Sequence, residues 1–279
     1  MSLRLTVLVD NNTLIDRYLL AEPGLSFLVE TGGTRVLFDT GFSDVFLRNA
    51  HKLGIDLSEL DCVALSHSHE DHTWGLEPLV RHYAELEWEK RPFRRPALVA
   101  HPKAFTSVSD PAFAEGGPLL SEAKLARHFP LKVSPEPQWL APGLVYLTGI
   151  PRRNDFEGRL SFGRKEGETG PDTVPEDAAL AYVSPQGLVV MVGCSHAGVC
   201  NTIEYAREVC GERRVADVIG GFHLQRPAKA HLEGTLAYFR ELRPQALHAC
   251  HCTDLKSKIA LAAVAEVQEV GAGLVLEYA

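Results

Sequence analysis

The chain of 279 residues is 45% hydrophobic and 23% charged, the composition of an ordinary globular protein, and it carries a formal net charge of −8. This acidic balance argues against a nucleic-acid partner, and no apolar stretch approaches the roughly 18 residues that a membrane span needs. The six cysteines are scattered and no export signal precedes them, so we expect reduced thiols and a cytoplasmic protein without a membrane partner.

The first half of the chain is rich in strands. Apolar or alternating runs bounded by turn residues predict strands over Leu3–Val9, Gly24–Glu30, Arg35–Phe38, Cys62–Leu65 and Ala97–Ala100. A helix is expected over Ser43–Leu53 with Ser43 as its N-cap, and another over Glu77–Glu89, where Pro78 falls in the first turn. The weakly patterned segment 102–140, rich in Pro, Ser and Gly, is expected to be a lid or an insert.

The second half repeats this order of strands followed by helices. Strands are expected over Gly143–Leu147, Ala179–Val183, Leu188–Val192, Ala216–Ile219 and Ala246–Ala249. Helices are expected from a capping box at Asn201 to Gly211, near Leu232–Leu242, and over about Leu255–Val270. The long polar segment 149–177 favours a second lid. With no repeat and no linker, the pattern predicts one domain over residues 1–279, in which two sheets pack face to face with helices outside.

The segment SHSHEDHTWG, residues 66–75, follows a predicted strand and contains three of the 12 histidines of the chain. His67 and His69 are separated by one residue, so in an extended backbone their rings project to the same side. Asp71 and His72 follow where the chain enters a helix, and they can point back to the same place. Imidazole and carboxylate groups suit zinc, manganese or iron, so the segment predicts the beginning of one or two adjacent metal sites.

This H-x-H-x-D-H pattern resembles the signature of the metallo-β-lactamase superfamily. The resemblance covers nearly the whole chain and implies an α/β fold, the four-layer αββα sandwich, with Asp39 in VLFDTG supporting the metal ligands from behind. It also implies that His251 in LHACHCTD is a ligand. In GCSH, Cys194 stands where the superfamily usually has a bridging aspartate. A thiolate can bind zinc and bridge two ions, and His196 is the candidate for the histidine that residues 146–156 lack.

Seven segments, in order along the chain, resemble one branch of this superfamily: DNN, FDTG, SHSHEDHTWG, AHPKAF, GCSHAGVCNTIE, GGFHL and HCTD. That branch is named for 7,8-dihydropterin-6-methyl-4-(β-D-ribofuranosyl)aminobenzene-5′-phosphate synthase, which joins a pterin to a ribosylaminobenzene phosphate with loss of diphosphate. The resemblance implies that Asn11, His101, Glu157 and His223 lie near a substrate pocket, although His101 and His223 fit a structural role as well. Arg152, in the long polar loop, is a candidate to bind a phosphate, with a solvated loop residue as the alternative.

Together these residues predict a metal-dependent enzyme that holds one or two divalent ions, zinc foremost, with manganese and iron as alternatives. Such ions lower the pKa of a bound water and polarise a phosphoryl or carbonyl oxygen, and Asp71 is the candidate acid or base. We expect a small phosphorylated or pterin-like substrate, and either hydrolysis or transfer with displacement of diphosphate. An iron-dependent redox enzyme and a metal-stabilised binding protein without turnover are the alternatives. The oligomeric state is left open by the sequence.

Overall fold

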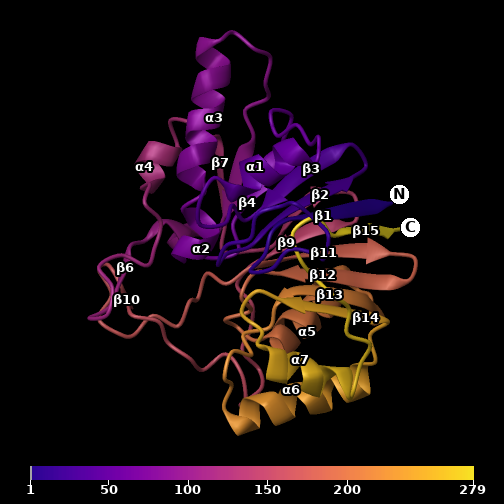
Figure 1. The fold of residues 1–279 in the computed structure, drawn as a ribbon. Helices are drawn as coiled ribbons and strands as arrows, with labels where there is room; N and C mark the ends of the chain where they lie inside the picture. Colours follow the sequence, from indigo (N-terminus) through magenta and orange to yellow (C-terminus); the bar gives the residue numbers. More distant parts are fainter. Residues whose placement is uncertain (1) are drawn as a thin grey trace.

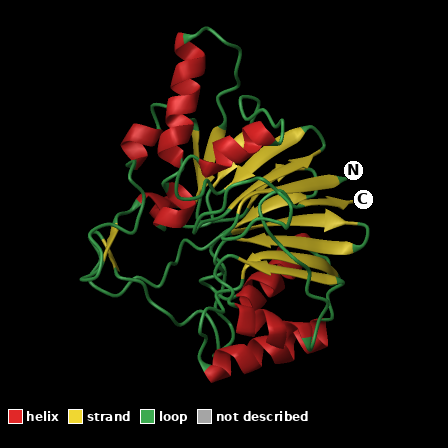
Figure 2. Ribbon diagram, in the orientation of Figure 1, coloured by secondary structure: helices red, strands yellow, loops and turns green. Residues whose placement is uncertain are grey.

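The computed structural model describes residues 2–279. Two sheets pack face to face, and helices cover both outer faces (Figure 1, Figure 2). Helices α1 (Val45–Lys52) and α3 (Leu76–Trp88) lie over one sheet, and α5 (Val199–Cys210), α6 (Lys229–Leu242) and α7 (Leu255–Ala262) lie over the other. This arrangement confirms the predicted four-layer αββα sandwich of an α/β chain.

Within the described residues, one sheet has seven strands in the order β15-β1-β2-β3-β4-β5-β7. In chain order these are β1 (Leu3–Val9), β2 (Ser26–Thr31), β3 (Thr34–Phe38), β4 (Cys62–Ala64), β5 (Ala97–Ala100), β7 (Leu131–Val133) and β15 (Val275–Tyr278). The strands from β15 to β3 are antiparallel, whereas β3, β4, β5 and β7 are parallel. Because β1 pairs with β15, the two ends of the chain lie side by side (Figure 1).

The second sheet has six strands among residues 2–279, in the order β14-β13-β12-β11-β9-β8. They are β8 (Gln138–Ala141), β9 (Leu144–Leu147), β11 (Ala179–Ser184), β12 (Gly187–Val192), β13 (Val215–Gly221) and β14 (Ala246–Cys250). Strands β12, β13 and β14 are parallel. A ribbon of β6 (Val108–Ser109) and β10 (Arg164–Lys165) stands apart from both sheets, at the left of Figure 1.

Apolar side chains of the described chain form three cores, one at each boundary between layers. Phe27, Tyr146 and Met191 belong to the core between the sheets, Phe46 to the core under α1 and α3, and Phe239 to the core over α5 and α6. All five side chains are fully buried. Burying a large apolar side chain contributes about 1.5–3 kcal/mol. Strand β12 is buried along its whole length because it packs on both faces, which is why its sequence GLVVMV does not alternate.

The parallel strands bring their carboxyl ends to one edge of the sandwich. In the seven-stranded sheet these are the ends of β3, β4 and β5, and in the six-stranded sheet the ends of β12, β13 and β14. The loops that follow these strands therefore meet over a rigid frame, the usual place for a functional site in an open α/β sheet.

Five short strands are not predicted by the sequence pattern: β6, β7, β8, β10 and β15. Strand β7 and most of β8 come from segment 102–140, so part of this segment supplies an outer strand to each sheet. Strand β15 lies beyond the predicted last helix, which ends at Ala262 and not at Val270, because residues 266–268 pair with Leu247 of β14. Short outer strands with half-buried side chains lack the apolar run that marks a central strand.

Helix boundaries follow from local hydrogen bonds. Helix α1 begins at Val45 with Asp44 as its N-cap, one position after the predicted Ser43, whose hydroxyl accepts the Val45 N–H at 3.3 Å. In α3, Pro78 falls in the first turn as expected. No helix within residues 2–279 is long and apolar enough to cross a membrane.

Candidate metal centre

Three imidazole rings from two sheets converge at this edge. His67 and His69 follow β4, and His196 follows β12. The Nε2 atom of His67 lies 3.1 Å from Nδ1 of His69 and 3.2 Å from Nε2 of His196. The three nitrogens lie within 4.8 Å of one another, and His67 is fully buried. We call these residues the three-histidine cluster.

A second group of donors lies beside the first. Helix α2 (Glu70–Thr73) carries Asp71 and His72, and His251 follows β14. The Nε2 atoms of His72 and His251 are 3.2 Å apart. The Asp71 carboxylate lies 3.3 Å from His251 Nε2 and 3.6 Å from His72 Nε2. We call these three residues the Asp71 cluster.

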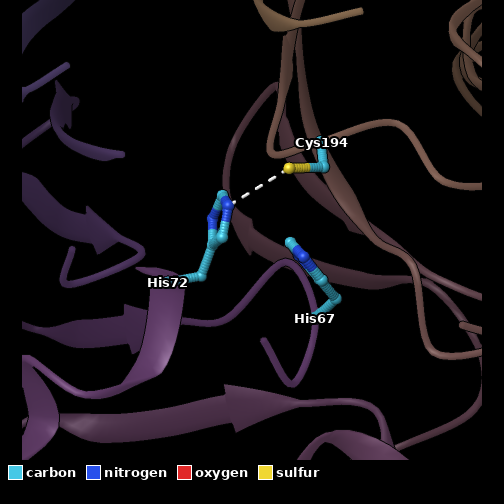
Figure 3. Close-up of side chains that lie close together, drawn as sticks. All are labelled: His67, His72 and Cys194. Carbon is cyan, nitrogen blue, oxygen red and sulfur yellow. Dashed lines mark hydrogen bonds between the residues drawn. The ribbon is translucent and has the colours of Figure 1, made fainter. Parts of the chain in front are cut away.

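The sulfur of Cys194 lies between the two clusters. Cys194 follows β12, and its Sγ is 3.3 Å from Nε2 of His72 and 3.2 Å from Nε2 of His251. Figure 3 shows His67 and His72 on one side of the centre and Cys194 approaching from the other, with the contact to His72 dashed. Its Sγ also lies within 4.8 Å of the donor atoms of both His67 and His72. Cys194 is therefore placed where one ligand can serve both clusters.

The spacing of these donors fits metal ions. Ligands of a tetrahedral zinc lie apart by about 1.6 times the metal–ligand distance, which is roughly 3.3 Å for nitrogens bound at about 2.0–2.1 Å. The nitrogen–nitrogen and nitrogen–sulfur separations here are 3.1–3.3 Å. Three ring nitrogens converge in the three-histidine cluster, and one proton joins only two of them, so this is an arrangement that could hold a metal ion.

Hydrogen-bonding groups behind the rings determine which nitrogen faces the centre. The Nδ1 atom of His72 lies 2.7 Å from the buried Asp39 carboxylate, and Nδ1 of His251 lies 2.9 Å from Oδ1 of Asn11. Each contact holds the opposite nitrogen, Nε2, toward the other donors. Such outer contacts fix the tautomer and orientation of metal-binding histidines and raise their basicity.

Backbone strain gathers at the same edge. Nine non-glycine residues in the described part of the chain have positive φ, and four of them follow strands that end here: Asp39 (57°), Ser195 (58°), His223 (54°) and His251 (51°). Such conformations cost of order 1–3 kcal/mol each and persist only where the surrounding structure holds them. Their clustering is typical of a functional site.

Burial sets the protonation of the three-histidine cluster. It lowers the pKa of His67 and His196 well below the usual value near 6.5, and the neighbouring imidazoles lower it further. Burial also lowers the pKa of His69 to about 3. The rings are therefore neutral at pH 7, the form in which imidazole binds metals. For His72, the carboxylates of Asp71 and Asp39 outweigh the effect of burial and raise the pKa to about 9.

A cavity of about 390 Å³ opens beside the two clusters. Its lining includes Asn11 and His223, as the family resemblance implies. The His223 ring lies 4.7 Å from that of His196. The aromatic side chains of Phe113 and Phe162 also line the cavity, although no sequence signal marks them as pocket residues.

Three residues predicted to lie near the substrate, His101, Arg152 and Glu157, have hydrogen-bond partners within the protein. His101 is the N-cap of a short 3-10 helix (η1, Pro102–Phe105) and accepts the Lys103 N–H at 3.0 Å. Arg152 donates to the carbonyl oxygens of Gly158 and Val174 and so cross-links the long loop. His101, Arg152 and Glu157 do not line the cavity of about 390 Å³.

Glu157 closes the N-terminus of α5. Its carboxylate accepts the N–H groups of Cys200 at 3.2 Å and Asn201 at 2.7 Å. Helix α5 begins at Val199, so the predicted capping box at Asn201 is wrong, because a residue from a distant loop supplies the cap. Glu157 also lines a smaller adjoining cavity of about 120 Å³ with His196.

Cys252 is a cavity residue for which the sequence predicts only a packing or loop role, since no second cysteine pair lies at a suitable distance. Its sulfur lies within 4.8 Å of the donor atoms of Cys194 and His251. Burial alone would raise the pKa of the Cys252 thiol, but a hydrogen bond from Cys194 and the charges of His251 and His223 lower it to about 5. In the sequence, only the position of Cys252 directly after His251 indicates that it lies near the site.

A buried ion pair joins the long polar loop to the histidine turn. Lys165 Nζ lies 2.6 Å from Glu176 Oε1 and donates to Ser68 Oγ at 2.8 Å. The Lys165 and Glu176 side chains are completely buried. Because Ser68 lies between His67 and His69 in the chain, the loop is fixed to the turn that carries two donors. A lysine in a polar loop is normally exposed to solvent, so the sequence does not predict this buried contact.

Comparison with known proteins agrees with this geometry. The profile of the family described as the metallo-beta-lactamase superfamily matches residues 20–209. The chain is 31% identical over 255 residues to the 7,8-dihydropterin-6-methyl-4-(beta-D-ribofuranosyl)-aminobenzene-5'-phosphate synthase of Methanocaldococcus jannaschii. That alignment covers 85% of this chain and 83% of the relative.

Solved structures show the same fold. The chain is 28% identical to Tm1679, described as a metal-dependent hydrolase of the beta-lactamase superfamily, with a TM-score of 0.81 and 98% of both chains covered. A diphosphatase from the PhnP family shares the fold at 18% identity, with a TM-score of 0.57 over 99% of this chain and 97% of that one.

Proposed function

The chain belongs to the metallo-β-lactamase superfamily, and from this premise we propose that it is a metal-dependent enzyme acting on a small phosphorylated or pterin-like substrate. It is related to a synthase that, by its name, makes a dihydropterin–ribofuranosylaminobenzene phosphate. The observation that carries the proposal is the pair of donor clusters with the Cys194 sulfur 3.2–3.3 Å from two of the imidazole nitrogens.

The three-histidine cluster and the Asp71 cluster would each hold one divalent ion, with Cys194 shared. Bound zinc would supply Lewis acidity and a nucleophilic water at neutral pH. Imidazole, carboxylate and thiolate together favour zinc, with iron as the alternative, over manganese, which prefers oxygen ligands.

The cavity favours a flat aromatic substrate. The Phe162 ring lies 5.5 Å from the His69 ring and 4.7 Å from the His196 ring, so an aromatic surface borders the three-histidine cluster. Among the described residues that line the cavity there is no Lys or Arg, so a substrate phosphate would be met by the ions and by neutral donors such as Gln225. The name of the Methanocaldococcus relative also contains an aminobenzene ring linked through a ribose to a phosphate.

Two side chains are placed to act on the reacting groups. Burial alone would raise the pKa of Asp71, but His72 and His251 outweigh it and lower that pKa, so the carboxylate is ionised, the state in which it can bind a divalent ion or orient a water by accepting its hydrogen bond. His223 faces the cavity beside His196 and can donate a hydrogen bond to a departing phosphate oxygen.

Exclusion of water would decide between hydrolysis and transfer. Phe162 belongs to the long segment 149–177, and Phe113 lies near the β6–β10 ribbon, so these segments cover the cavity from one side. A covered site can admit an aromatic acceptor in place of water, and transfer then displaces diphosphate. The name of Tm1679 supports hydrolysis, and that of the synthase supports transfer.

A substrate screen with product identification tests the proposal. The zinc-loaded chain is incubated with a pterin methyl diphosphate, alone and with a ribosylaminobenzene phosphate, and with phosphodiesters and phosphomonoesters. We expect turnover that His69→Ala abolishes, with a condensed product if the enzyme is a transferase. Tight binding of product-like ligands without any turnover would instead support a binding protein.

A further inference from the structure

We propose that Cys252 is a second thiolate ligand of the ion at the Asp71 cluster. All coordination positions of the ion at the Asp71 cluster would then be occupied by protein ligands, two of them sulfurs. The ion at the three-histidine cluster would keep one open coordination position for substrate or water. The inference rests on the proposed function, since it requires that the site bind divalent ions.

The position of Cys252 carries the first part of the inference. It follows His251 directly, at the end of β14, and its Sγ lies within 4.8 Å of both a His251 ring nitrogen and the Cys194 sulfur. The side chain is half-buried and lines the cavity. Its hydrogen bond to the Cys194 carbonyl oxygen, at 3.6 Å, is long, and a thiol is a weak donor.

The space for this sulfur comes from a glycine. A Cβ atom at Gly221 would lie 2.5 Å from Cys252 Sγ and 3.2 Å from Cδ2 of His251. A side chain at position 221 would therefore overlap the Cys252 sulfur, and it would also meet the Gly193 carbonyl oxygen at 2.6 Å. Because φ at Gly221 is not positive, this glycine is needed for the space and not for its backbone conformation.

The donor count then differs between the two positions. Asp71, His72 and His251 form one group of donors within 4.8 Å of one another, and Cys194, His251 and Cys252 form a second group that shares His251. Joined at His251, the two groups would offer one oxygen, two nitrogens and two sulfurs to one ion. The other ion would have three nitrogens and a share of Cys194. Zinc sites filled by protein ligands are structural, and catalytic sites keep an open position. The chemistry is thus assigned to the three-histidine side, which the Phe162 and His223 rings adjoin at 4.7 Å from His196.

Cobalt substitution tests this assignment independently of activity. Metal-free protein, kept reduced and under nitrogen, is titrated with Co²⁺ while the near-ultraviolet thiolate-to-cobalt charge-transfer band is recorded. We expect Cys252→Ser to lose about a third of the band, because the two sulfur–cobalt bonds of the shared Cys194 would remain out of three. Cys210→Ser, at the end of α5 and outside both clusters, is the matched control and should keep the full band.

The outcomes separate the inference from the proposed function. A full band in Cys252→Ser, or wild-type protein that binds cobalt without any thiolate band, would overturn the role of Cys252 and leave the metal-dependent enzyme standing. Wild-type protein that binds no cobalt would overturn both.

A second measurement needs no variant. The wild-type chain is alkylated with iodoacetamide before and after loading with zinc, and the peptide that contains Cys252 is quantified by mass spectrometry. We expect zinc to suppress alkylation of Cys252 by at least about tenfold, because a metal-bound thiolate is not free to react. Equal alkylation with and without zinc would overturn the inference even if Cys252→Ser fails to fold.

Discussion

The Oδ2 atom of Asp39 lies 2.7 Å from Nδ1 of His72, and neither side chain is exposed to solvent. The other oxygen of the same carboxylate accepts the N–H of Ser66 at 2.7 Å. One buried carboxylate at the end of β3 thus fixes both the backbone that leads into the histidine turn and the ring of a proposed ligand.

Asp39→Ala should weaken metal binding. Loss of a group that orients a metal-binding histidine typically costs about 10–100-fold in affinity, and we expect a loss of that size here. Competition with a chromophoric chelator measures it. The exposed Asp155→Ala is the control, and equal affinities in the two variants would show that Asp39 has no part in the site.

His69→Ala should lose at least one equivalent of metal per chain while keeping its secondary structure. Its Nδ1 is one of three nitrogens that face a common centre, and two are a weak site for zinc. Elemental analysis and circular dichroism of the same sample report the two effects. The exposed His51→Ala should keep the metal content of the wild type; if His69→Ala keeps it too, His69 is not a ligand.

Lys165→Met should destabilise the fold strongly. It leaves the carboxylate of Glu176 buried without its cation, which typically costs about 3–5 kcal/mol. Lys103→Met is the control, because Lys103 forms an ion pair of similar length with Glu168 at the surface. The Lys103 and Glu168 side chains are 43% and 37% exposed, so loss of this pair should cost under about 1 kcal/mol. Urea denaturation gives both free energies of unfolding. Similar values for the two variants would mean that the buried pair does not hold the loop.

Glu157→Ala should lower stability and leave metal content unchanged. The carboxylate caps α5, and loss of a helix cap costs about 0.5–2 kcal/mol. Thermal unfolding measures the loss. A variant of normal stability with impaired substrate binding would return Glu157 to the substrate role that the family resemblance implies.

The histidine turn could be predicted because its donors are close in sequence. His67, His69, Asp71 and His72 lie within six positions after a buried strand, and such spacing leaves little choice of geometry. Cys194 and His251 could be placed only because strands of a sandwich bring their ends to one edge, which requires the fold to be known first.

Some residues near this edge make contacts that the sequence pattern does not predict. Glu157 caps helix α5 by accepting the N–H of Asn201, which lies 44 positions further along the chain. No local sequence pattern predicts a cap from so distant a residue. Arg152 binds carbonyl oxygens within its own loop, which a guanidinium can do as readily as it binds phosphate. Cys252 lies beside Cys194 only because β12 and β14 end at the same edge, which no local pattern predicts.

An anomalous difference map from crystals of the zinc-loaded protein, collected at the zinc edge, tests the central claim most directly. We predict one peak among His67, His69 and His196 and a second among Asp71, His72 and His251, with Cys194 in contact with both. Crystals grown with excess zinc that show no peak at either cluster would contradict the assignment of these residues as ligands and, with it, the proposed metal-dependent enzyme.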